Sequence, residues 1–292
     1  MIDVKLQLSA SIDIGAVPPR LRGVAIASLI IAGLIAFASL GGIISTGPYA
    51  RETWLWRTQG IGQDWANLTV AVPWLVSTAV LVYRGARRAR LLLGGGLLYA
   101  AYAYATYAFA VHFNTLFLVY CAILGASTYV FAGLASELGD VRRWFAPDAP
   151  ARLAAGFEMA CAGGFSLLWL SQIAVALVTS TAPAGLAATG LATNPIHVLD
   201  LSLVLPAMFL GGWQLWHHRS LGYVLVPIFL GFGALMAACL TAIAIAMYAA
   251  QPASGVAPVI GFAAFSLVGT ALLIALFRRL SPRGASVGLA LE

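Results

Sequence analysis

Eight apolar stretches, each about as long as a membrane-crossing helix, dominate this sequence. A helix needs roughly 20 residues to cross a hydrocarbon core about 30 Å thick. Repeated along the whole chain, such runs predict an all-α, polytopic integral membrane bundle of about eight transmembrane helices. The stretches cover residues 22–45, 64–83, 91–112, 114–136, 153–179, 196–216, 221–249 and 256–278.

The composition excludes the main soluble classes. The chain is 61% hydrophobic and 9% charged, whereas soluble domains carry about 25% charged residues. The lipid bilayer is therefore the first partner that we expect. The net charge of +6 does not indicate nucleic acid as a partner, because the chain has no soluble basic patch with interleaved aromatic residues.

The basic residues predict an orientation for the bundle. They fall in every second turn between helices, and only Arg51 and Arg57 lie in the opposite set of turns. Cytoplasmic loops are enriched in Lys and Arg, so we expect both termini in the cytoplasm. The basic turns contain Arg20 and Arg22; Arg84, Arg87, Arg88 and Arg90; Arg142, Arg143 and Arg152; His217, His218 and Arg219; and Arg278, Arg279 and Arg283.

Two short tails flank the bundle, residues 1–19 and 281–292. Residues 2–14, IDVKLQLSASIDI, alternate apolar and polar side chains, which is typical of a strand. An isolated strand is not stable in water. We therefore expect this segment to lie on the membrane surface, to pair with a partner or with a second copy of the chain in a homo-oligomer, or to be disordered.

Two polar segments resemble each other. GQDWANLTVAVP spans residues 62–73, and NPIHVLDLSLVLP spans residues 194–206. Their final prolines, Pro73 and Pro206, are 206 − 73 = 133 positions apart. Polar residues are scarce in this chain, so their coincidence at one offset indicates an internal repeat. At this offset Asp64 aligns with His197, Asn67 with Asp200, and Thr69 with Ser202.

The repeat predicts a division of the chain into two units. The first four-helix repeat would span residues 20–140 and the second residues 153–280, with a basic cytoplasmic linker at residues 141–152. Because each unit has an even number of helices, the two repeats would be parallel, related by an axis along the membrane normal.

Each polar segment presents two polar side chains on one helix face, because residues three apart are neighbours on a helix. The pairs are Asp64 with Asn67 and His197 with Asp200, all predicted at the outer ends of their helices. A structural interpretation stays open: Asp64 could cap a helix, and the others could join helices by hydrogen bonds. The pair of His197 and Asp200 could act as a proton relay, a metal ligand set or an ion pair.

A tyrosine-rich stretch adds further candidates. Residues 99–107 contain four tyrosines, and His112 and Asn114 follow at the outer end of the predicted helix. An aromatic belt at the membrane interface is the structural alternative. The complete set of candidate ligand-binding residues is Asp64, Asn67, His197, Asp200, Tyr104, Tyr107, His112 and Asn114.

Glu158 and Trp169 are expected to have structural roles. Glu158 lies close to Arg152, so we expect it to reach the membrane surface or to form a salt bridge. Trp169 is expected to pack against other helices or to join an aromatic belt.

Signatures of catalysis and of cofactor binding are scarce. The only lysine is Lys5, which excludes a retinal Schiff base in a membrane span. The three cysteines lie in apolar stretches without a CxxC motif, which does not indicate a disulfide framework or a zinc knuckle. Weak metal-ligand candidates are His112, His197, Asp64 and Asp200, and the cofactor, if the chain takes one, is unknown.

The segments GQDWANLTVAVP and YAFAVHFNTLFLVY, residues 107–120, resemble a pattern in bacterial multi-span membrane proteins that have no assigned function. The resemblance covers much of residues 40–135 and extends weakly to NPIHVLDLSLVLP. It implies the bacterial inner membrane as the location and draws attention to Asp64 and Asn114. It implies no activity, cofactor or substrate.

We therefore expect a membrane protein with an outward-facing polar cavity that binds or transports a small ligand or ion. Two alternatives stay open. One is a metal-dependent enzyme acting at the outer leaflet of the membrane. The other is a non-catalytic scaffold or sensor that contacts its partner through the N-terminal tail.

Overall fold

The computed structural model describes residues 17–146, 149–183 and 185–280. The strand-like segment at residues 2–14 and the tail at 281–292 lie outside these ranges. The described chain is helical and has no β-strand. Its longer elements are α1 (Pro19–Ile44), α2 (Trp54–Ala66), η3 (Asn67–Ala71), α3 (Val72–Tyr83), α4 (Arg87–Ala110), α5 (Phe117–Ser136), α6 (Ala151–Thr179), α7 (Leu186–Thr189), α8 (Pro195–Leu199), η5 (Asp200–Val204), α9 (Leu205–Trp216), α10 (Ser220–Ala250) and α11 (Ala257–Arg278).

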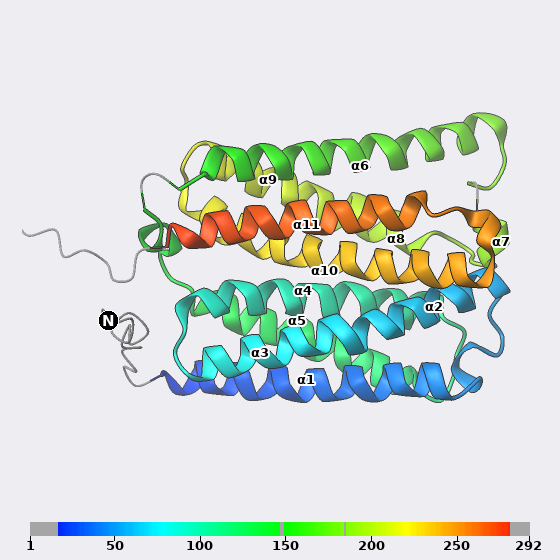
Figure 1. Ribbon diagram of the computed structural model, residues 1–292, viewed down its shortest axis with the longest axis horizontal. Helices are drawn as coiled ribbons and strands as arrows, with labels where there is room; N and C mark the ends of the chain where they lie inside the picture. Colours follow the sequence, from blue (N-terminus) through cyan, green and yellow to red (C-terminus); the bar gives the residue numbers. More distant parts are fainter. Residues whose placement is uncertain (1–16, 147–148, 184, 281–292) are drawn as a thin grey trace, which may run out of the picture.

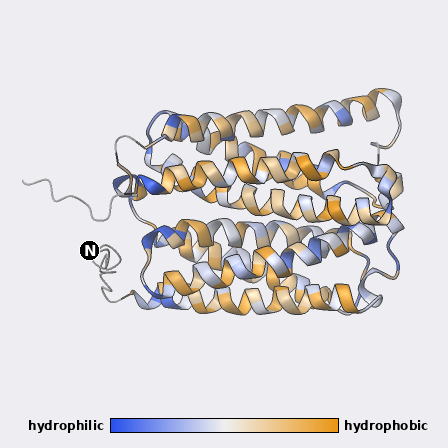
Figure 2. Cartoon of the chain, viewed as in Figure 1, coloured by the Kyte–Doolittle hydropathy of each residue, from blue (hydrophilic) through white to orange (hydrophobic). Residues whose placement is uncertain are grey.

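Seven helical segments of the described chain are long and apolar enough to cross a membrane, which supports the predicted all-α membrane bundle. Figure 2 shows apolar residues along the helices throughout the structure. Helix α4 is not among the seven, because its glycines and tyrosines make it less apolar, although it has 24 residues and lies within the bundle. The seven segments are Pro19–Ile44, Trp54–Tyr83, Phe117–Ser136, Ala151–Thr179, Pro195–Trp216, Ser220–Ala250 and Ala257–Arg278.

The helices run up and down along one long axis (Figure 1). Helix α1 packs against α3 and α5, and α4 packs against α3, α5 and α10. In the later half of the chain, α10 packs against α9 and α11, and α6 packs mainly against α9. Helix α10 also contacts α2, so α4 and α10 together join the two halves of the bundle.

The turns that carry most arginines meet at one end of the bundle. Helix α1 begins and α11 ends at this end (Figure 1). Arg88 Nη2 donates a hydrogen bond to the carbonyl of Leu280 at 2.9 Å, and the Ala146 amide donates to the carbonyl of Arg279 at 2.8 Å. We call this the arginine-rich end and the other the opposite end. Which end faces the cytoplasm stays a prediction.

The second membrane segment begins ten residues earlier than its apolar run predicts, since helix α2 starts at Trp54 rather than near Asp64. The hydroxyl of Thr53 accepts a hydrogen bond from the Trp56 amide at 3.3 Å and caps the helix. The predicted position of Asp64 at the outer end of its helix is therefore wrong, as is its interpretation as a cap. Asp64 lies almost three turns inside, where its side chain is buried.

Both polar segments contain a five-residue π-helical turn that ends two positions before a proline. In η3 the amide of Val72 bonds to the carbonyl of Asn67, and in η5 the amide of Leu205 bonds to the carbonyl of Asp200. A proline has no N–H group, so the normal α-helical ladder cannot continue past Pro73 or Pro206. A π-turn before the proline rearranges these bonds.

The hydroxyl groups near these prolines bond locally. The Thr69 hydroxyl donates to the carbonyl of Trp65 at 2.7 Å, and the Ser202 hydroxyl donates to the carbonyl of Val198. Each hydroxyl bonds to the carbonyl four residues earlier in the chain. This hydrogen-bond pattern often bends helices. The two segments thus share the π-turn, the proline and the hydroxyl contact at the offset of 133 positions.

Candidate functional site

Asp64 is the centre of a first polar cluster, formed where α1, α2 and α4 meet. Its carboxylate accepts hydrogen bonds from the hydroxyls of Tyr49 at 2.6 Å and Tyr107 at 2.9 Å. The residue is 2% exposed. Gly42 of α1 faces this carboxylate, and a Cβ atom there would overlap Asp64 Oδ2. Asp64 is thus held by two phenols in a closely packed position.

Asn67 extends the first cluster by one turn toward the middle of the bundle. Its Nδ2 donates to the Ser39 hydroxyl at 3.1 Å, and its Oδ1 accepts from the Tyr99 hydroxyl at 2.8 Å. Gln63 Nε2 donates to the same tyrosine at 2.8 Å, and the Cys239 thiol of α10 donates to Gln63 Oε1 at 2.7 Å. Since Asn67 is fully buried, the cluster reaches from α1 through α4 to α10.

Tyr49 and Tyr104 complete the first cluster in different ways. Tyr49 lies in the loop before α2, and burial, followed by the negative charge of Asp64, raises the pKa of its phenol well above its ordinary value. The Tyr104 ring stacks on Tyr107 with centroids 5.2 Å apart. The Tyr104 hydroxyl is buried and has no hydrogen-bond partner. Tyr104 therefore offers one free polar atom inside the cluster.

Asp200 is the centre of a second polar cluster, between α4, α6 and η5. Its carboxylate accepts from the Tyr102 hydroxyl at 3.0 Å and from Trp169 Nε1 at 2.8 Å. The His197 ring packs against Trp169 at an interplanar angle of 40°, with ring centroids 4.7 Å apart. The imidazole Nε2 of His197 is buried without a partner. Trp169 was expected only to pack or to join an aromatic belt, but its indole also donates a hydrogen bond to the Asp200 carboxylate.

His197 and Asp200 do not form the ion pair that the sequence left open as one of their roles. They are not among the side chains of opposite charge that lie within 4.0 Å in the described chain. Asp200 instead takes both of its hydrogen bonds from other helices. The pair shares a location but lacks a direct bond.

Asp64 and Asp200 lie against different sides of α4. Tyr107 binds Asp64 and Tyr102 binds Asp200; five positions apart, the two tyrosines point about 140° apart around the helix. No hydrogen bond in the described chain joins Asp64 to Asp200. Asp64 and Asp200 therefore belong to two different clusters.

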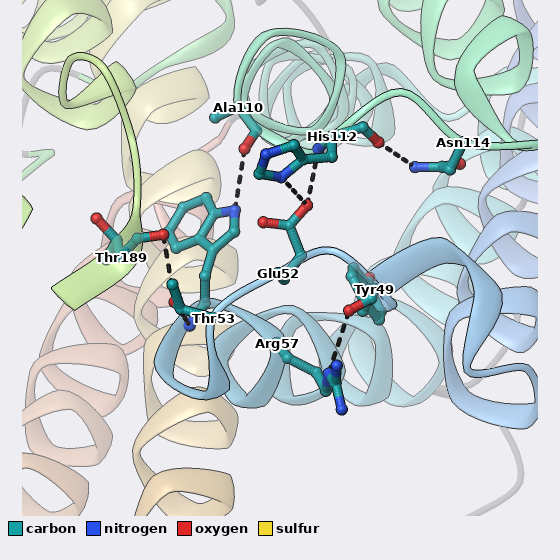
Figure 3. A network of polar contacts seen from close by, with 9 residues as sticks. Tyr49, Glu52, Thr53, Arg57, Ala110, His112, Asn114 and Thr189 are labelled. Atoms are coloured by element: carbon teal, nitrogen blue, oxygen red, sulfur yellow. Dashed lines mark hydrogen bonds and ion pairs between the residues drawn. The ribbon is translucent and has the colours of Figure 1, made fainter. Parts of the chain in front are cut away.

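His112 and Asn114 belong to a third place, in the loop between α4 and α5 at the opposite end of the bundle (Figure 3). The carboxylate of Glu52 accepts from the His112 amide at 2.7 Å and contacts its Nδ1 at 3.0 Å. Asn114 Oδ1 accepts from the Leu116 amide at 2.8 Å, so this side chain shapes the turn before α5. These contacts fasten two loops together, and the Glu52 amide donates to the carbonyl of Tyr49 at 3.1 Å, so this place adjoins the first cluster.

Two surface hollows lie at the opposite end. The larger, about 460 Å³, lies between α4 and α8 and is mostly apolar; Ala105, Phe109, Val198 and Leu199 are among its lining residues. Since Leu199 directly precedes Asp200, this hollow lies close to the second cluster. The smaller, about 220 Å³, is lined by Arg51, His112, Asn114 and Thr115, among others.

The four weak metal-ligand candidates do not come together. Within the described ranges, no group of three or more His, Cys, Asp or Glu side chains is placed to hold a metal ion. Asp64, Asp200 and His112 lie in the three separate places described above, with His197 beside Asp200. The arrangement does not provide a shared ligand set.

Several residues that the structure places in these clusters carry no distinguishing pattern in the sequence. Tyr49 and Glu52 lie in a loop whose sequence has no periodic pattern, and Ser39 lies in an apolar helix. Only the tyrosine run pointed toward Tyr99 and Tyr102. Glu158, expected to reach the surface or to pair with Arg152, is instead buried and unpaired.

The fold defines the chain as a helical integral membrane protein. No family model matches it, and no curated protein or solved structure does so either.

Proposed function

We propose that this protein binds a small ligand or ion within the membrane and carries it across, using the carboxyl groups of Asp64 and Asp200. The observation that carries this proposal is that both carboxyl groups lie inside the bundle without a basic partner among the described residues. Each lies in a membrane-length helix, each is bound by a tyrosine of α4, and within the described chain neither has a basic partner within 4.0 Å.

The cost of placing a carboxylate in a membrane helix indicates a functional role for these two residues. A charged side chain at the centre of a membrane helix costs about 2.5 kcal/mol or more, and such residues mark ion and substrate pathways. A purely structural role would be served at lower cost by neutral side chains such as Asn or Ser. Two acidic groups in the two corresponding polar segments, each bound by a tyrosine of α4, favour a transport role.

The chemistry of the first cluster favours a small cation as the ligand. Asp64 and the hydroxyls of Tyr49 and Tyr107 present oxygen atoms within hydrogen-bond distance of one another. Hard cations prefer carboxylate, hydroxyl and carbonyl oxygens. At the second cluster, the apolar hollow between α4 and α8 would serve as the entrance, and the free Nε2 of His197 would be a further ligand-binding atom.

The correspondence between the two polar segments, which we interpret as an internal repeat, supports the same proposal. The π-turns begin at Asn67 and Asp200, and the prolines follow at Pro73 and Pro206, all at the offset of 133 positions. The packing order also corresponds, since α1 contacts α3 as α6 contacts α9, and α5 contacts α4 as α11 contacts α10. Transporters often place binding residues at equivalent positions of two repeats.

Neither alternative has an observation in its favour. A metal-dependent enzyme would require ligands that converge, and its four candidate ligands are dispersed. A scaffold role would rest on the N-terminal segment outside the described residues. We keep the bacterial inner membrane, cytoplasmic termini and a possible homo-oligomer as parts of the proposal that rest on the sequence alone.

Thermal unfolding of the purified protein in detergent tests the proposal, with Na⁺, Li⁺ and K⁺ as probes and choline as the control ion. We expect at least one cation to stabilise wild type, and the shift to shrink in Asp64→Asn and in Asp200→Asn. Asp140→Asn, which alters an exposed loop carboxylate, is the matched control. Equal shifts in wild type and both site variants would exclude these carboxyl groups as the binding site.

Transport itself needs a second measurement. Proteoliposomes loaded with a fluorescent indicator for the stabilising cation should show uptake that depends on wild-type protein. Asp64→Asn should reduce the uptake rate at least tenfold, whereas Asp140→Asn should not. Cation binding without uptake would leave a binding protein and remove the transport part of the proposal.

A further inference from the structure

A third acidic residue, Glu158, lies on the buried face of α6, where this helix packs against α9. Glu158 is 1% exposed. We call this contact between the two helices the α6–α9 seam. The other buried residues of α6 are all alanines: Ala151, Ala154, Ala155, Ala162 and Ala176. One carboxyl group therefore stands alone on a face of methyl groups.

The seam is closely packed next to this carboxyl group. A Cβ atom added to Gly212 of α9 would lie 2.7 Å from Met159 Cγ and 2.9 Å from the carbonyl oxygen of Ala155. Ala155 also belongs to an apolar cluster with Leu215 of α9. The two helix backbones thus approach each other within one turn of Glu158, in apolar surroundings.

No neighbouring group compensates a negative charge at this position. Glu158 Oε2 is buried and has no hydrogen-bond partner, and Glu158 is in none of the ion pairs within 4.0 Å in the described chain. The nearby titratable group is the thiol of Cys161 on the same helix; Arg152 is exposed. An unpaired ionised carboxylate is far more costly in such surroundings than a neutral carboxylic acid.

We propose that Glu158 is a proton-binding site, neutral while the α6–α9 seam is closed, which exchanges its proton when α6 moves away from α9. Helix α6 lies at the edge of the bundle and packs mainly on α9 (Figure 1). Trp169, which binds Asp200, lies 169 − 158 = 11 residues further along, roughly 16 Å at 1.5 Å per residue. Helix α6 thus contacts carboxyl groups at two depths: its own Glu158 and, through Trp169, Asp200 of η5. This inference does not rest on ligand binding at Asp64 or Asp200.

Infrared spectroscopy of the full chain in lipid bilayers at neutral pH tests the protonation directly. A protonated carboxyl group has a C=O stretch that is separate from the bands of ionised carboxylates. We expect Glu158→Gln to remove one such band from the wild-type spectrum. Asp140→Asn, which changes an exposed carboxylate, should leave the region unchanged. Identical wild-type and Glu158→Gln spectra in this region would overturn the proposal.

The pH dependence of unfolding provides an independent readout. At neutral pH the unfolded chain releases a proton from Glu158 that the folded chain retains. The wild-type unfolding constant should therefore rise about tenfold more per pH unit than that of Glu158→Gln between about pH 6 and pH 8. Glu158→Leu, which leaves no polar group in the seam, provides the same comparison when the glutamine variant does not fold. Equal slopes in wild type and variant would contradict a bound proton.

Discussion

Asn67 and Asp200 occupy the same position in two separate membrane segments: each is the first residue of a five-residue π-turn, and each precedes a proline by six positions. Each also binds a tyrosine of α4, Tyr99 and Tyr102 respectively. Since a π-turn inserts an extra residue into the helix, it rotates the polar side chains before it relative to the apolar face after it. The turn thereby lets one continuous segment direct polar groups toward α4.

The position of Gly42 opposite Asp64 leads to a first prediction. Gly42→Ala should lower the free energy of unfolding by about 1–3 kcal/mol, because the added methyl group overlaps a closely packed carboxylate. Gly33→Ala in the same helix is the matched control, since a Cβ there meets nothing within 4 Å. Unfolding in a denaturing detergent measures both. If the clash is the cause, combining Gly42→Ala with Asp64→Ala should recover part of the loss.

The hydrogen bond from Tyr107 to Asp64 leads to a second prediction. Tyr107→Phe should destabilise the protein by roughly 1.5–3 kcal/mol, the usual range for a hydrogen bond to a charged group. Tyr129→Phe is the control, because Tyr129 is 80% exposed on α5. A double-mutant cycle with Asp64→Ala, which removes the acceptor, would isolate the interaction. A coupling energy of zero would mean that this bond does not stabilise the folded state.

The contact between Glu52 and His112 predicts that Glu52→Ala lowers the free energy of unfolding more than His112→Ala does. Glu52→Ala removes the acceptor for both the amide and the ring of His112, and should cost about 1–3 kcal/mol. His112→Ala keeps the amide bond and should cost less. Hydrogen exchange at residues 111–115, read by mass spectrometry, should accelerate strongly only in Glu52→Ala. Arg51→Ala, in the same loop, should exchange like wild type.

The buried phenol of Tyr49 predicts sensitivity to alkali. Its pKa is raised in the folded chain, by burial first and by Asp64 second, so its contribution to stability is complete below the ordinary tyrosine value of about 10. Above that pH the unfolded chain ionises this phenol and the folded chain does not, and stability is lost. The logarithm of the unfolding constant should rise with pH more steeply in wild type than in Tyr49→Phe, by up to about one per pH unit. Parallel slopes would disagree with this assignment.

Part of the architecture can be inferred from local sequence because each helix satisfies its own backbone hydrogen bonds. A membrane span needs only a sufficient apolar run, so most of the expected boundaries lie within a few residues of the observed ones. The exception is informative. Residues 54–63 contain polar residues such as Arg57 and Gln63 and were expected as a loop, but the Thr53 cap and packing against α10 make them helical.

The polar clusters could be predicted only in part. Asp64, Asn67, His197 and Asp200 were identifiable because charged and amide groups are rare in apolar helices. Their partners Tyr49, Ser39 and Trp169 were not, since a tyrosine, a serine or a tryptophan in a membrane helix or its flanking loop is ordinary. Glu158 was misassigned for a related reason: proximity to Arg152 along the chain does not show which side of the helix faces α9.

The sequence by itself determined the membrane class, the helical architecture, the alternation of basic turns and the spacing of the two proline segments, because these depend on local composition and periodicity. The tertiary structure alone decided that Asp64 and Asp200 lie on different sides of α4, that His112 is held by Glu52, and that Glu158 lies unpaired in the α6–α9 seam. The physical reason is that hydrogen bonds and burial in a bundle depend on how each helix is rotated against its neighbours, and that rotation is set by packing between residues far apart in the chain.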